Sequence, residues 1–87
     1  MFLSEVKDTF KNTLNCTILC CRTDDDLILM CINKNVTDHK NINKLHKILN
    51  KYESDINFKF RKSHGFYWYK LTEANLLKLM LLIKLEG

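Results

Sequence analysis

Several residue types are scarce in this chain of 87 residues, and each scarcity excludes something. There is no proline and no glutamine, and the only internal glycine is Gly65. A chain with one internal glycine has no glycine-rich phosphate loop, which argues against a nucleotide-dependent enzyme. The most apolar stretch, residues 76–85, is interrupted by Lys78 and Lys84 and is about half the length that spans a bilayer. We therefore expect no membrane association.

The N-terminal segment and the cysteines indicate the cellular compartment in which the protein is expected. Residues 1–14 include Glu5, Lys7 and Asp8, so they lack the uninterrupted apolar region of a signal peptide. We expect a cytoplasmic, non-secreted protein whose thiols stay reduced. The cysteines show none of the close paired spacings of a zinc site, so we expect buried thiols, no metal and no other cofactor. They are Cys16, Cys20, Cys21 and Cys31.

The overall composition is that of a globular protein, with 46% hydrophobic and 28% charged residues. The length suits a single domain, residues 1–87, with one core. A domain this small is only marginally stable alone, so a homodimer is an open alternative. Lysine outnumbers arginine twelve to two and asparagine occurs nine times, a usage that A/T-rich codons produce. Viruses, phages and several bacterial and protist groups have such genomes, and a virus- or phage-encoded accessory factor is the interpretation that we carry forward.

The net charge of +4 is unevenly distributed along the chain. Residues 1–33 carry three basic and five acidic residues, whereas residues 34–87 carry eleven basic and five acidic residues. The C-terminal part is therefore clearly basic, which is a feature of surfaces that bind nucleic acids. The structural alternative is that these lysines only solvate the surface.

Hydrophobic periodicity predicts three helices, over residues 2–14, 38–52 and 73–85. Thr37 or Asp38 is expected to cap the second helix, and Thr72 the third. The third helix is apolar nearly all round, so it is either the central core helix or one with a spare apolar face.

Four apolar or alternating segments predict strands, over residues 15–22, 27–32, 56–62 and 66–71. Short turns join the first two strands and the last two, which gives two antiparallel hairpins. The predicted fold is therefore α+β, in the order αββαββα, with a four-stranded antiparallel sheet of two hairpins packed against helices.

This element order is similar to that of a LAGLIDADG homing-endonuclease unit. The first helix, which begins Phe2-Leu3-Ser4-Glu5, has neither the small-residue interface nor the terminal acidic metal ligand of that family. The resemblance is therefore one of topology, and we expect no nuclease activity. Since no other catalytic motif is present, we do not expect an enzyme.

The most distinctive segment covers residues 59–70, with the sequence KFRKSHGFYWYK, in which aromatic and basic residues are interleaved. Cations neutralise phosphates and flat rings stack on bases, so the segment predicts nucleic-acid binding. The structural alternative is an ordinary aromatic strand with cross-strand contacts between lysine or arginine and tyrosine.

The register of this hairpin decides which side chains are exposed. We expect a three-residue loop, Ser63 to Gly65, which sets Phe60 opposite Trp68 and directs both into the core together with Phe58. A four-residue loop would pair Phe60 with Tyr67 and separate apolar from polar side chains less cleanly. The preferred register places four side chains on one exposed face: Lys59, Arg61, Tyr67 and Tyr69.

We therefore expect a small basic nucleic-acid-binding protein that acts by binding, with single-stranded RNA favoured because no duplex-reading helix is present. The exposed face above would be its stacking platform, and three further residues would contact phosphates: Lys62, His64 and Lys70. The alternative is a protein–protein interaction module that inhibits or adapts a host protein. Its surface would be the apolar last helix or the acidic turn Asp24 to Asp26.

Overall fold

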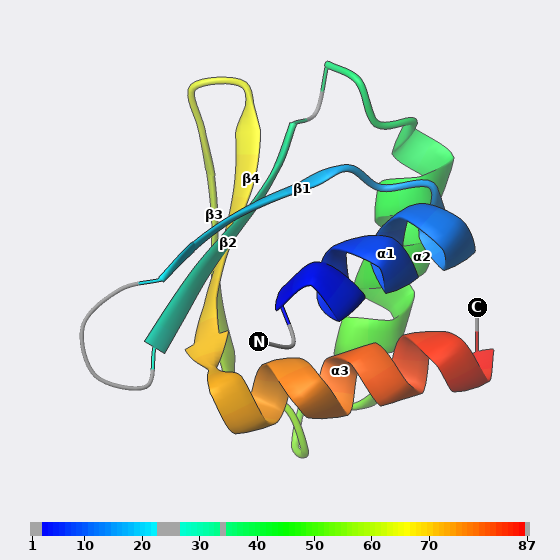
Figure 1. Cartoon of the computed structure of the whole chain (residues 1–87), viewed down its shortest axis with the longest axis vertical. Coiled ribbons are helices and arrows are strands. Elements are labelled where there is room, and N and C mark those ends of the chain that lie inside the picture. Colours follow the sequence, from blue (N-terminus) through cyan, green and yellow to red (C-terminus); the bar gives the residue numbers. More distant parts are fainter. Residues whose placement is uncertain (1–2, 23–26, 34, 87) are drawn as a thin grey trace.

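The structure is a computed structural model that describes residues 3–22, 27–33 and 35–86. Its elements in chain order are α1 (Leu3–Leu14), β1 (Ile18–Arg22), β2 (Leu27–Asn33), α2 (His39–Lys51), β3 (Phe58–Ser63), β4 (Phe66–Thr72) and α3 (Glu73–Glu86). The sheet has the strand order β1-β2-β4-β3, and every neighbouring pair is antiparallel. The three helices lie on one side of the sheet (Figure 1). The predicted α+β class and element order are confirmed.

Strand β1 begins three residues later than predicted, because residues 15–17 follow the end of α1 as a connection. Asn15 takes a left-handed φ of 52°. The amides of Asn15 and Cys16 donate to the carbonyls of Lys11 and Phe10, both at 3.1 Å. These bonds satisfy carbonyls that a helix leaves open at its C-terminus. The predicted turn Asp24 to Asp26 lies outside the described residues.

Side-chain caps start the other two helices. The Asp38 carboxylate accepts a hydrogen bond from the Lys40 amide at 3.1 Å, so Asp38 caps α2 rather than Thr37. The Thr72 hydroxyl accepts from the Asn75 amide at 3.2 Å at the start of α3. Each cap satisfies an amide that has no partner within its helix.

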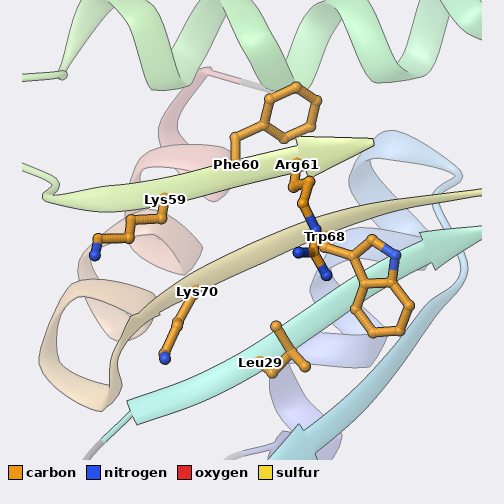
Figure 2. A pocket seen from close by; sticks show the side chains of 6 residues that line it. All are labelled: Leu29, Lys59, Phe60, Arg61, Trp68 and Lys70. Atoms are coloured by element: carbon orange, nitrogen blue, oxygen red, sulfur yellow. The ribbon is translucent and has the colours of Figure 1, made fainter. Parts of the chain in front are cut away.

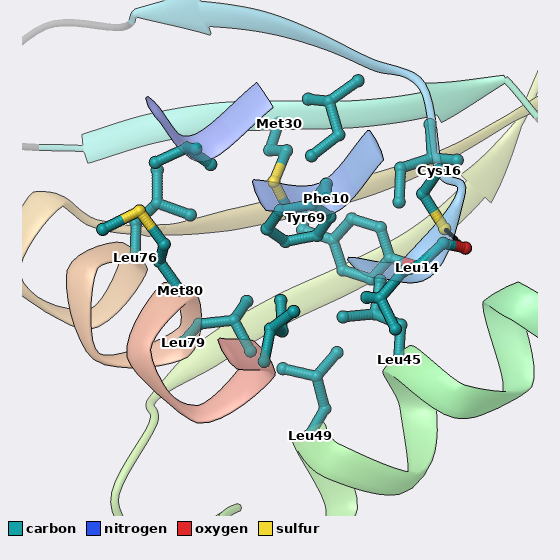
Figure 3. Close-up of a cluster of buried hydrophobic side chains, with 14 of the residues drawn as sticks. Phe10, Leu14, Cys16, Met30, Leu45, Leu49, Tyr69, Leu76, Leu79 and Met80 are labelled. Atoms are coloured by element: carbon teal, nitrogen blue, oxygen red, sulfur yellow. Dashed lines mark hydrogen bonds between the residues drawn. The ribbon is translucent and has the colours of Figure 1, made fainter. Parts of the chain in front are cut away.

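One hydrophobic core fills the space between the helices and the inner face of the sheet (Figure 3). Helices α1, α2 and α3 contribute aliphatic side chains and Phe10, and the sheet contributes alternate residues of β2 and β4. Among the largest fully buried side chains are Phe10, Met30, Leu45, Leu49, Tyr69 and Leu76.

Helix α3 is apolar on both sides: one side packs in the core, and the other is an exposed apolar face. Four of its side chains are buried: Leu76, Leu79, Met80 and Ile83. On the outer side Leu77, Leu81 and Leu85 are 43%, 57% and 78% exposed. Within the described ranges, no helix is both long enough and apolar enough to cross a bilayer.

The β3–β4 hairpin differs in register from the prediction. Only His64 and Gly65 connect the strands, with φ values of 53° and 82°, and Ser63 pairs with Phe66. Positive φ at both central residues is the requirement of a type I′ turn, whose twist matches that of paired strands. The expected three-residue loop is therefore wrong, and Phe60 lies opposite Tyr69.

Candidate nucleic-acid interface

The shorter turn reverses the faces of β4 relative to the prediction. Tyr67 and Tyr69 point towards the helices and are 6% and 1% exposed. The expectation that both rings lie exposed beside Lys59 and Arg61 is therefore wrong, because a buried ring has no free face for a base. Trp68, which was expected in the core, lies on the other face and is half-buried.

The two tyrosines belong to an aromatic cluster beneath α2. The Tyr69 hydroxyl lies 2.8 Å from Nε2 of His46, and the His46 ring meets the Phe60 ring edge-on with centroids 4.9 Å apart. The rings of Phe60 and Tyr67 are stacked at 5.8 Å. Burial raises the pKa of Tyr69, so its phenol stays protonated and hydrogen-bonded to His46. The cluster joins α2 to β3 and β4.

His46 makes the stability of this cluster depend on pH. Burial, and then the charge of Lys62, lowers the pKa of His46 below its ordinary value of about 6.5. The unfolded chain therefore takes up this proton at a higher pH than the folded chain. Neutral His46 therefore contributes to the free energy of unfolding. We expect this contribution to be complete above about pH 7 and to fall as the pH drops below about 6.5.

Urea unfolding at pH 7.5, 6.5 and 5.5 measures this effect. His46→Gln, which has no titrating group, should show a weaker dependence over the same range. Equal slopes for the two proteins would mean that other groups cause the dependence.

Two of the expected phosphate contacts lie apart from the rest. Lys62 pairs with Tyr67 in register and shares its side of the sheet, with Nζ 5.6 Å from the Tyr67 ring centroid. His64 is exposed in the turn, where Nδ1 lies beside the Ser63 hydroxyl. The hairpin therefore brings together only Lys59, Arg61 and Lys70 of the expected site residues.

The face of the sheet opposite the helices, called the open face below, carries these three cations. Pairing across the strands aligns its side chains in rows, spaced by the roughly 4.8 Å between strands. One row runs Leu19, Cys31, Trp68 and Arg61, and the next contains Leu29, Lys70 and Lys59. Arg61 thus lies directly opposite Trp68, and Lys59 directly opposite Lys70.

A shallow hollow of about 440 Å³ lies where the two rows meet. Figure 2 shows Arg61 beside Trp68, with Lys59, Lys70 and Leu29 around them, and Phe60 turned the other way towards α2. The indole N–H of Trp68 donates to the Ser63 carbonyl at 3.1 Å, which fixes the orientation of the ring. The hollow therefore has an apolar floor, one oriented aromatic ring and a cationic rim.

The charges of this face are of one sign. Among the described residues that point outward from the sheet, none is acidic. Lys59 and Lys70 are direct cross-strand partners, and like charges in that position destabilise a sheet. An anion bound between them would relieve the repulsion.

Two thiols, those of Cys16 and Cys31, are described by the structure, and both are buried. Cys16 is fully buried and burial raises its pKa to about 11, so it stays a neutral thiol at physiological pH. Cys31 is buried on the open face with Sγ 3.2 Å from the Leu19 carbonyl. Among the described residues, no three His, Cys, Asp or Glu side chains are grouped so that they could hold a metal ion.

Comparison of the chain with known protein families, curated proteins and solved structures finds no match. The function must therefore be argued from the geometry of the open face.

Proposed function

We propose that the chain binds single-stranded nucleic acid, with RNA as the first candidate, on the open face of its sheet. The observation that carries the proposal is the juxtaposition of the Arg61–Trp68 and Lys59–Lys70 pairs on a face with no acidic residue among those described. The three cations would neutralise phosphates, and the indole would stack on a base.

The apolar part of this face favours a single strand over a duplex. Leu19 is 50% exposed, and Leu29 and Trp68 are half-buried beside it in the same two rows. A duplex presents its phosphates to a flat surface and keeps its base faces stacked inside. A single strand can turn its bases onto apolar and aromatic side chains while its phosphates reach the cations at the rim.

Removing the three cations tests this assignment. In Lys59→Gln/Arg61→Gln/Lys70→Gln, affinity for a labelled U₁₅ RNA at low salt should fall about tenfold or more. The slope of log affinity against log salt should decrease by about 2, since each contact with a single strand contributes about 0.7. Fluorescence anisotropy at several salt concentrations gives both quantities.

The matched control removes the same charge from the helical side of the molecule. Lys7→Gln/Lys78→Gln/Lys84→Gln changes three exposed lysines of α1 and α3. Its affinity and salt slope should stay close to those of the unchanged protein. Equal losses in the two triple variants would mean that net charge, and not the open face, causes the binding.

The second candidate, binding of a protein partner, has its own observation in α3. Leu77, Leu81 and Leu85 recur every four residues along the outer side of the helix and are well exposed. Leu81→Gln separates the candidates, because it changes this stripe and leaves the open face intact. Under the nucleic-acid proposal this variant keeps the RNA affinity of the unchanged protein.

A further inference from the structure

Helix α2 carries a row of lysines on the side that faces away from the sheet. Lys40, Lys44, Lys47 and Lys51 are all exposed and are spaced four, three and four residues apart. At about 100° per residue these spacings keep the four side chains within one sector of roughly 60°. The buried residues Ile42, Leu45 and Leu49 lie on the opposite side of α2, and Ile48 is buried beside the row. His46 faces β4.

This row, called the lysine row below, lacks the acidic residues that normally accompany lysines on a solvated helix. Residues 39–51 contain no aspartate or glutamate. Like charges three or four residues apart destabilise a helix by about 0.2–0.5 kcal/mol per pair. Lys40 also lies in the first turn, where the helix dipole disfavours a cation. Lys40, Lys44 and Lys47 therefore repel one another, and a bound polyanion would relieve this repulsion, whereas Lys51 is paired with Glu86 of α3.

The shape of the surface suits an extended ligand. A hollow of about 620 Å³ lies beside the C-terminal part of the row and is lined by Leu14, Lys44, Lys47, Ile48, Lys51 and Glu86. Lys51 is bonded to Glu86 of α3, which leaves the other lysines of the row to meet a ligand. From Lys40 to Lys51 the helix rises about 16 Å, a length over which the two strands of a duplex together carry about ten phosphates, some of them on the side that faces the row.

We propose that the lysine row is a second phosphate-binding surface, and that the protein bridges two nucleic-acid segments. Helix α2, which carries the row, lies on the helical side of the sheet, and the open face is the other side of that sheet (Figure 1). The hydrophobic core fills the space between α2 and the sheet. The phosphate-binding role of the row stands on its own, whereas the bridging rests on the proposed function of the open face.

The chemistry of the row favours nucleic acid over other polyanions. Lysine binds phosphate as a point charge, so it does not require the fixed bidentate geometry with which arginine binds phosphate. Among the residues that line the hollow, the apolar side chains Leu14 and Ile48 are both buried, so this lining offers no exposed hydrophobic side chain for insertion into a membrane. We therefore assign the row to the phosphate backbone of a duplex, which it would contact without regard to base sequence.

Energy transfer between two labelled nucleic acids tests the bridging. A donor-labelled U₁₅ RNA and an acceptor-labelled 20-base-pair DNA duplex are mixed with the full chain at low salt. We expect protein-dependent transfer that rises and then falls as protein exceeds the two ligands. In Lys40→Gln/Lys44→Gln/Lys47→Gln, duplex affinity should fall about tenfold or more and transfer should disappear, while U₁₅ affinity stays within about twofold.

The control Lys7→Gln/Lys78→Gln/Lys84→Gln should retain transfer. Transfer in the lysine-row variant equal to that of the unchanged protein would overturn the proposal. Row-dependent binding of anionic phosphatidylserine vesicles without duplex binding would overturn it as well. If the row binds duplex but U₁₅ binds nowhere, the second surface stands and both the bridging and the function proposed for the open face fall.

Discussion

Replacing Trp68 by alanine is expected to weaken binding of single-stranded RNA by about 5- to 150-fold, since a base stacked on an aromatic ring contributes about 1–3 kcal/mol. The ring is half-buried on the open face, is oriented by its bond to the Ser63 carbonyl, and lies opposite Arg61. Fluorescence anisotropy with labelled U₁₅ measures the loss.

Two companion variants separate stacking from folding. Trp68→Phe retains a ring and should bind with an intermediate affinity. Tyr67→Phe changes a buried ring on the other side of the sheet and should bind as the unchanged protein does. Circular dichroism and urea unfolding confirm that each variant is folded. If Trp68→Ala bound RNA as tightly as the unchanged protein, stacking on the open face would be excluded.

Replacing Tyr69 by alanine is expected to lower the free energy of unfolding by about 3–5 kcal/mol, as for other large aromatic residues removed from a core. Tyr69 is 1% exposed and lies among the rings of His46, Phe60 and Tyr67. A domain of this length has a total stability on the order of 4–13 kcal/mol. The substitution should therefore remove between about a quarter and all of the stability, and the variant should unfold at a much lower urea concentration than the unchanged protein.

Tyr69→Phe is the matched control, because it keeps the ring and removes only the hydroxyl that contacts His46. Its loss should be about 1 kcal/mol, the contribution of one hydrogen bond. Urea titrations followed by circular dichroism give both values. A fully stable Tyr69→Ala would place Tyr69 at the surface and restore the three-residue turn that the structure rejects.

The element order could be predicted from the sequence because each element carries its own local signal. Asp38 and Thr72, for example, have short side chains with an oxygen that can accept a hydrogen bond from a free amide at the start of a helix, and both cap helices. The late start of β1 was missed, since Asn15 is compatible both with a strand and with the end of a helix. The pairing of β2 with β4 joins segments far apart in the chain, and no local pattern encodes it.

The faces of β4 could have been predicted from its final residues. Lys70 is exposed and Leu71 is buried, and in a strand Tyr69 and Tyr67 share the side of Leu71 while Trp68 shares that of Lys70. The hairpin sequence alone favours the three-residue turn, because tyrosine is more polar than tryptophan and is therefore expected on the exposed face. A tyrosine whose hydroxyl has a partner, as Tyr69 has in His46, is readily buried.

The central claim is that a single strand binds against Trp68, and intrinsic fluorescence tests it directly because this is the only tryptophan in the chain. Unlabelled U₁₅ RNA is titrated into the protein at low salt while indole emission is recorded, and salt is then added. We predict saturable quenching that salt reverses and that Lys59→Gln/Arg61→Gln/Lys70→Gln strongly weakens. Emission that stays unchanged through the titration, whether or not the RNA binds elsewhere, would contradict the claim.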